Sequence, residues 1–253
     1  MNLYAICTPS HRILRDQWLL PSIRGEYDAR IVDCDQECPR AEYKSRGWAR
    51  TVARKFDVLQ RAVRENENAV FVFCDVDIQF LQPTTQRILA QMEGRDLLFL
   101  RGAGGECCTG FIACRSSDRT LAFWARATRW TGLLGMDDQD AVNMLLAERR
   151  GAFFLSCIGR TVLAHLRRLL GRDLLRMPAY VENDGDRATR VNAEGIRWGF
   201  LDPSFFSPSA PWRPGMPLAV PDGIAMHHAN WTFGVQNKIA QLSAVRAMIG
   251  PQR

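Results

Sequence analysis

The chain has 253 residues, 47% of them hydrophobic, and a formal net charge of +6 at pH 7. This length allows one α/β domain with a large core, and no apolar stretch reaches the ~18 residues needed to span a bilayer. Aromatic residues are not interleaved with the arginines, which argues against nucleic acid as a partner. The first nine residues lack the regions of a signal peptide, and the scattered cysteines fit reduced thiols, so we expect a cytoplasmic protein.

The first half of the chain alternates short apolar runs with longer amphipathic patterns. In chain order it predicts a strand at residues 2–7, a helix at 13–23, a strand at 29–32, a helix at 48–64, a strand at 69–74, a helix at 83–92, and strands at 97–100 and 110–114. Such alternation is typical of a parallel sheet covered by helices on both faces. We therefore predict a single α/β domain with a mostly parallel central sheet.

The second half of the chain is less regular. It predicts helices at residues 119–129, 138–149, 159–170 and 235–249, an extended loop at 203–221 and a short strand at 224–226. The segment 159–176 alternates leucines with arginines, and two interpretations stay open. It is either a helix packed on the core with a solvated basic face, or a helix that lies on an anionic membrane at its cytoplasmic side.

Two aspartates, Asp75 and Asp77, follow the apolar run at residues 69–74. A run this apolar is typical of a strand buried on both faces, and open α/β sheets bind ligands at the carboxyl ends of such strands. With a bend in the loop, the two carboxylates can converge on one hard cation, which suits the phosphates of a nucleotide. The alternative is an ordinary solvated turn, and in both cases we expect carboxylates that face solvent.

Three later motifs carry further polar groups: Thr109-Gly110-Phe111, Asp138-Gln139-Asp140, and His228 followed by Gly234 and Lys238. Taken singly, each has a plain structural interpretation. The first is a strand entrance, the second places acids in the first turn of a helix, and the third contains a buried or turn histidine. His227 is the rival of His228 for any such role, because sequence alone does not distinguish two neighbouring residues.

Together with Asp75 and Asp77, the order and spacing of these motifs resemble the nucleotide-diphospho-sugar transferases. These are GT-A-fold glycosyltransferases related to the retaining, glycogenin-like galactosyl- and glucosyltransferases. The resemblance runs from Leu3 to about Ile249 and implies a single GT-A-like domain over residues 1–253. Residues 1–115 would be the nucleotide-binding half, and residues 116–253 the acceptor side with a tail that binds metal and diphosphate.

The resemblance also implies an activity. It implies metal-dependent transfer of a hexose or pentose from a nucleoside diphosphate sugar, first of all a UDP-sugar. The acceptor would be a glycan, a lipid-linked molecule or a protein. We expect retention of the anomeric configuration, because the run from Asp138 to Asn143 matches the retaining relatives. The spacing from His228 to Gly234 departs from the family pattern, so inversion stays an alternative.

The resemblance assigns roles to individual residues. Mn²⁺ or Mg²⁺ would be bound by Asp75, Asp77 and His228. The donor nucleotide would contact Thr8, Ser10, Lys55, Asp75, Val76 and Lys238. The sugar would lie along Thr109, Gly110, Asp138 and Gln139, and the backbone would approach it closely at the glycine. Asp138 and Gln139 would be the catalytic pair, on the face of the sugar away from the leaving group.

Two other functions remain as alternatives. A haloacid-dehalogenase-like phosphatase would use Asp75 as nucleophile and Asp77 as acid and base. In those phosphatases the two aspartates usually end the first strand of the domain, and a threonine or valine follows them at a fixed distance. This chain has Gln79 at that position. The second alternative is a non-enzymatic basic binding module.

Overall fold

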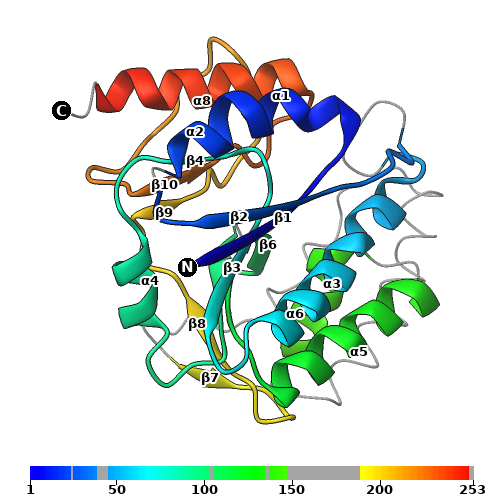
Figure 1. The fold of residues 1–253 in the computed structure, drawn as a ribbon. Coiled ribbons are helices and arrows are strands. Elements are labelled where there is room, and N and C mark those ends of the chain that lie inside the picture. Colours follow the sequence, from blue (N-terminus) through cyan, green and yellow to red (C-terminus); the bar gives the residue numbers. More distant parts are fainter. Residues whose placement is uncertain (24, 39–44, 103–104, 135–136, 147–188, 251–253) are drawn as a thin grey trace.

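The computed structural model of the chain describes residues 1–23, 25–38, 45–102, 105–134, 137–146 and 189–250. A seven-stranded sheet with the order β2-β1-β3-β6-β5-β8-β7 forms its centre (Figure 1). Its strands are β1 (Asn2–Cys7), β2 (Asp28–Asp33), β3 (Val70–Cys74), β5 (Leu97–Arg101), β6 (Cys107–Arg115), β7 (Arg190–Val191) and β8 (Arg197–Phe200). A smaller sheet has the order β4-β10-β9, with β4 (Ile78–Phe80), β9 (Phe205–Phe206) and β10 (Met226–His228).

Strands β1, β2, β3, β5 and β8 run in one direction, in agreement with the predicted mostly parallel sheet. β6 is antiparallel to its neighbours β3 and β5, and β7 is antiparallel to β8. The prediction of alternating strands and helices missed this reversal. Only residues 102–106 separate β5 from β6, which is too short for the crossover that a parallel pair requires.

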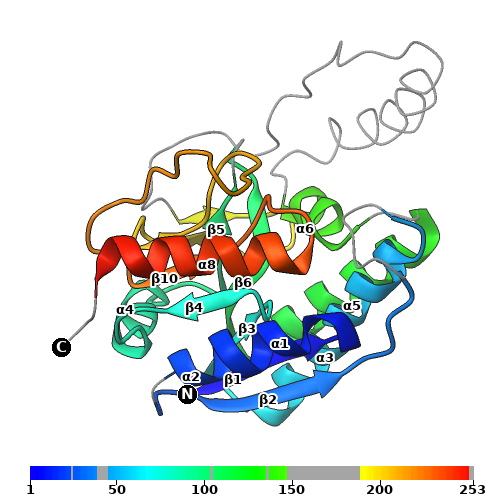
Figure 2. The same ribbon diagram turned by 90° about the horizontal axis from the view of Figure 1, so that it is seen from above.

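Helices cover both faces of the large sheet, as predicted (Figure 1). They are α1 (Arg12–Leu14), α2 (Leu20–Ser22), α3 (Trp48–Glu65), α4 (Thr85–Gln91), α5 (Asp118–Leu134), α6 (Asp138–Leu146) and α8 (Val235–Ile249). One face packs against α3, α5 and α6, where the rings of Phe56 and Trp124 stack with centroids 6.0 Å apart. The opposite face carries α1, α2, α4 and the small sheet, against which α8 packs (Figure 2).

The predicted helix at residues 13–23 is not one continuous α-helix. A 3₁₀ turn at Pro9–His11 leads into α1, a π-helical turn at Arg15–Leu19 follows, and α2 ends the segment. Pro21 lies at the start of α2 and lacks the backbone N–H that an uninterrupted helix would need there. The π-helical turn just before Pro21 is a rare element that occurs mostly as a single turn inside α-helices.

The predicted strand at residues 224–226 is shifted to Met226–His228, because the chain pairs there with β4. The short strand β4 was not predicted, since its pairing partner lies far along the chain. The predicted helix at residues 159–170, with its proposed membrane contact, lies outside the described residues. In the ranges that the structure covers, no helix combines the length and hydropathy that crossing a membrane requires.

Candidate active site

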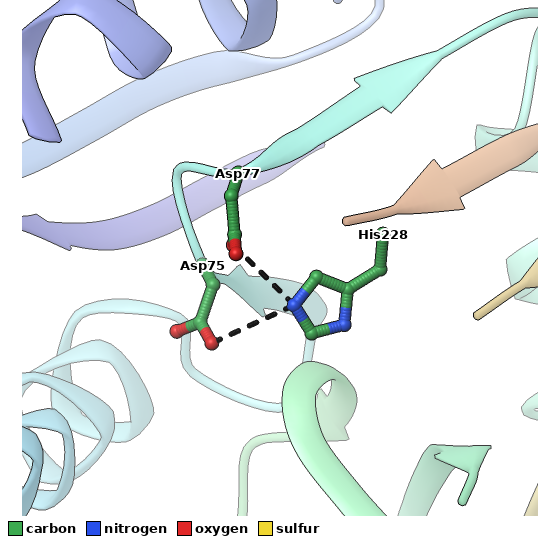
Figure 3. Close-up of side chains that lie close together, drawn as sticks. All are labelled: Asp75, Asp77 and His228. Atoms are coloured by element: carbon green, nitrogen blue, oxygen red, sulfur yellow. Dashed lines mark ion pairs between the residues drawn. The ribbon is translucent and has the colours of Figure 1, made fainter. Parts of the chain in front are cut away.

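Asp75, Asp77 and His228 converge at the end of β3 (Figure 3). Each offers one potential ligand atom, and the three atoms lie within 4.8 Å of one another. The Nε2 atom of His228 is 3.3 Å from Oδ1 of Asp77 and 3.9 Å from Oδ2 of Asp75. The backbone holds this arrangement, because His228 pairs with Ile78 and the N–H of Ala229 donates to the carbonyl of Asp77 at 2.9 Å.

The structure shows which of the two neighbouring histidines faces the aspartates. They lie on a strand, so their side chains point to opposite faces. His227 turns away from the aspartates, stacks on Phe206 with ring centroids 5.7 Å apart, and contacts Nε2 of Gln79 at 3.2 Å. Burial lowers the pKa of His227 to about 3. Of the two, only His228 faces the carboxylates.

Asp77 does not face solvent as expected. Its side chain is only 8% exposed, because β10 pairs beside it and α8 supplies Lys238 as an ion-pair partner. Burial opposes ionisation of Asp77, but Lys238 and His228 outweigh it and lower the pKa of this carboxyl well below its ordinary value. In the same way, Asp77 overcomes the effect of burial on His228 and raises the pKa of the imidazole to about 10.

Lys55 joins Asp75 to the helix that begins at Asp138. Its Nζ atom lies 2.8 Å from Oδ1 of Asp75 and 2.9 Å from Oδ2 of Asp138. The hydroxyl of Thr109 donates to the same oxygen of Asp138 at 2.8 Å. Burial alone would lower the pKa of Lys55. The two carboxylates outweigh this effect, so the pKa is raised above its ordinary value. Burial raises the pKa of Asp75, although the ammonium of Lys55 opposes this shift.

The start of α6 presents its acidic residues in different ways. Asp137 caps the helix, because its Oδ1 atom accepts the backbone N–H of Asp140 at 2.7 Å. Asp138 is therefore not needed as the cap and points inward to Lys55. The side chain of Asn143 fixes α6 to β6 through two hydrogen bonds of 2.8 Å to the backbone of Cys107. Gln139 lines the cleft beside Asp138.

Residues that follow β1 also line this cleft. Thr8 lines the cleft, whereas Ser10 does not. Their hydroxyls lie 2.9 and 3.0 Å from Nδ1 of His11, and His11 also lines the cleft. Sequence reasoning missed His11, although its place just beyond the carboxyl end of a parallel strand is a usable signal.

One cleft of about 240 Å³ collects nearly all the predicted site residues. Those that line it are Thr8, Lys55, Asp75, Val76, Asp77, Thr109, Gly110, Asp138, Gln139, His228 and Lys238. Side chains without an assigned role complete the wall, among them Trp48, Thr51 and Trp231. Trp231 has a positive φ of 55°, a strained conformation for a non-glycine residue.

The donor set at Asp75, Asp77 and His228 fits a divalent cation. Two carboxylates and one imidazole suit Mn²⁺ well and Mg²⁺ less well, because hard cations prefer oxygen. Lys55, Lys238 and His228 compensate the negative charge of these carboxylates. A bound cation would take over part of this compensation, and His228 would then bind it as a neutral imidazole.

The fold and the cleft define an α/β protein with a potential cation site at the end of a central strand. The family model described as nucleotide-diphospho-sugar transferase matches residues 18–242. The match spans most of the 253 residues, and the chain belongs to this family. The resemblance seen in the sequence motifs is thereby confirmed. No curated protein matches the chain.

Solved glycosyltransferase structures show a distant similarity. GlyE of Streptococcus pneumoniae TIGR4 is 13% identical, with 74% of this chain and 55% of that chain covered and a TM-score of 0.42. The galactosyltransferase LgtC in complex with donor and acceptor sugar analogs is 10% identical, with 56% and 69% covered and a TM-score of 0.36. An active-site mutant of LgtC is 10% identical, with 90% and 86% covered and a TM-score of 0.40. The chain therefore spans about half the length of GlyE, and these scores support no conclusion about function.

Proposed function

We propose that the protein is a metal-dependent glycosyltransferase that uses a nucleoside diphosphate sugar as donor. The observation that carries the proposal is the convergence of Asp75, Asp77 and His228 in a cleft of a nucleotide-diphospho-sugar transferase family member. A divalent ion held by these residues would neutralise the charge that develops on the departing diphosphate. The acceptor would be a hydroxyl of a glycan, a lipid-linked molecule or a protein.

The charged side chains around the cleft support a division of roles. Lys238 lies beside Asp77 and would bind the diphosphate as a point charge. Thr8 lines the same cleft and would contact the nucleobase and ribose. Asp138 and Gln139, at the start of α6, would face the sugar and stabilise positive charge that develops at its C1 carbon.

The proposed transfer is a substitution at C1 of the sugar. The bond between C1 and the diphosphate oxygen breaks, and the electron pair leaves with the nucleoside diphosphate. The acceptor hydroxyl oxygen forms the new bond to C1, and its proton passes to the departing diphosphate. When both events occur on the same face of the sugar, the anomeric configuration is retained, and this is the stereochemistry that we propose. The donor that we propose is a UDP-hexose or UDP-pentose.

A hydrolysis assay across sugar nucleotides tests the proposal without knowledge of the acceptor. UDP-glucose, UDP-galactose, UDP-xylose, and GDP- and dTDP-linked sugars are compared with Mn²⁺, with Mg²⁺ and with EDTA. We expect turnover of a UDP-sugar that depends on the metal, and proton NMR of the fresh product should show the retained anomer. Faster turnover of a GDP- or dTDP-sugar would refute the uridine donor. Turnover that EDTA leaves unchanged would refute the metal.

A further inference from the structure

Gly110 in β6 lies directly against the imidazole of His228. A Cβ atom added at Gly110 would lie 2.2 Å from Cε1, 2.8 Å from Nδ1 and 2.9 Å from Nε2 of that ring. Non-bonded carbon atoms normally approach to about 3.5–4.0 Å, so even one methyl group does not fit. The φ angle of Gly110 lies outside the left-handed region, so the backbone conformation does not itself require glycine.

Burial and a contact at Nδ1 restrict the movement of the imidazole. Its side chain is only 4% exposed, and Sγ of Cys108 lies 3.9 Å from Nδ1 on the side away from the aspartates. The amide of Asn230 in turn lies 3.6 Å from this sulfur atom. A methyl group at Gly110 would therefore shift the ring and change the position of Nε2 relative to the two carboxylates.

The backbone of Gly110 is equally fixed. Its carbonyl accepts the N–H of Asp75 at 2.8 Å, so β6 is tied at this point to the loop that carries the aspartates. The next residue, Phe111, pairs with Cys74 in the sheet. Movement of β6 would break the hydrogen bond between Gly110 and Asp75, and movement of the ring would disturb its contacts with Cys108 and Asp77.

We propose that Gly110 is a positioning residue, and that its missing side chain provides the slot that aims His228 at Asp75 and Asp77. This differs from the sequence-based expectation that the glycine lets the backbone approach the sugar. The inference rests on the proposed metal role of His228. Its consequence is that the smallest possible side chain at residue 110 disrupts the metal site before any donor binds.

A mutant cycle in EDTA tests the slot itself. Gly110→Ala should lower the melting temperature by several degrees, because the added methyl group overpacks a buried site. In the His228→Ala background the same substitution should cause no further drop, since the ring that it displaces is absent. Equal drops in melting temperature in the two backgrounds would overturn the proposal that Gly110 makes room for the imidazole of His228.

Binding of Mn²⁺ without nucleotide, followed by electron paramagnetic resonance, tests the consequence for the metal. Gly110→Ala should weaken Mn²⁺ binding about 10- to 100-fold, as loss of a residue that orients a ligand typically does. Gly132→Ala in α5 is the matched control, because a Cβ there meets nothing within 4 Å, and it should bind Mn²⁺ like the wild type. Unchanged Mn²⁺ affinity in Gly110→Ala, with a raised KM for the donor, would assign the glycine to the sugar and overturn the inference. A wild-type protein that binds no Mn²⁺ would overturn the proposed function as well, whereas additivity in the cycle would overturn the slot alone.

Discussion

Two lysines flank the candidate site, and the structure holds them in different ways. Lys55 in α3 is 7% exposed at its side chain and lies within 2.9 Å of two carboxylates, Asp75 and Asp138. Lys238 in α8 is 16% exposed, pairs with one carboxylate, Asp77, and donates to the carbonyl of Ala229 at 3.0 Å. Lys55 therefore connects two walls of the cleft. Lys238 pairs with a carboxylate on one wall only, and its side chain is more exposed.

This difference indicates that Lys55 holds the site in place, whereas Lys238 can exchange its carboxylate partner for the diphosphate of a donor. Without Lys55, the buried Asp138 and the partly exposed Asp75 lose their shared counter-charge at once, and loss of one partner from a buried pair is costly. Without Lys238, Asp77 keeps the imidazole of His228 at 3.3 Å. We therefore expect Lys55 to contribute mainly to stability and to the placement of the carboxylates. Lys238 should contribute mainly to donor binding.

The largest effect is expected from Asp77→Asn, which removes the carboxylate that Lys238 and His228 share. The amide keeps the shape of the side chain but loses the charge, so metal-dependent turnover of the donor should be abolished. The measurement is the hydrolysis rate in Mn²⁺, with circular dichroism to verify the fold. Asp57→Asn, an exposed carboxylate on α3, is the matched control and should keep the full rate. Full activity of Asp77→Asn in EDTA would contradict the metal role.

Lys55→Met should give the largest loss of stability. It leaves Asp75 and Asp138 without their shared ammonium, and loss of one partner from a buried pair costs about 3–5 kcal/mol. Urea unfolding followed by fluorescence measures the change in the free energy of unfolding. A loss below about 1 kcal/mol, the range of exposed pairs, would show that Lys55 does not bridge the two walls.

Lys238→Met should act on the donor instead. We expect UDP affinity in Mn²⁺ to fall by about 1.5–3 kcal/mol, the range for a hydrogen bond to a charged group. The free energy of unfolding should fall less than in Lys55→Met, since Asp77 retains His228. Calorimetric titration with UDP, together with the urea unfolding of both variants, measures the two effects. Equal losses of stability in the two variants would remove the distinction between the lysines.

Arg61→Met should give the smallest loss in the free energy of unfolding among these variants. Arg61 lies on the same helix as Lys55, but its ion pair with Glu65 at 3.4 Å is on the surface, with side chains 49% and 36% exposed. Exposed pairs at this helical spacing contribute about 0.3–0.5 kcal/mol. Unfolding in urea at low and high salt should show this small loss, and the difference from wild type should shrink in high salt. A loss as large as that of Lys55→Met would mean that any cation on α3 has the same effect.

Local patterns predicted much of the fold. The apolar run of β3 and the stripe of Phe56, Leu59 and Val63 on α3 need only periodicity to be recognised, and the final helix has the predicted bounds. The reversal of β6 and the pairing of β4 with β10 depend on contacts between distant segments, which no local pattern records. The burial of Asp77 follows from that second pairing and was missed for the same reason.

At the site, the motif spacing predicted which residues gather in one cleft but not how they face one another. The choice of His228 over His227 needed the register of β10 against β4. Lys55 lines the cleft as its predicted donor contact requires, but the spacing did not reveal that its ammonium lies between Asp75 and Asp138. The tight approach of Gly110 to an imidazole 118 positions away is a matter of side-chain geometry, which sequence spacing does not contain.

The central claim is that Asp75, Asp77 and His228 hold a divalent ion that carries the diphosphate of the donor. Calorimetric titration of the wild-type protein with UDP, in Mn²⁺ and in EDTA, tests it most directly. The account predicts one UDP site in Mn²⁺, which is lost in EDTA and lost in Asp77→Asn. Equally tight UDP binding in EDTA, or in Asp77→Asn, would contradict it.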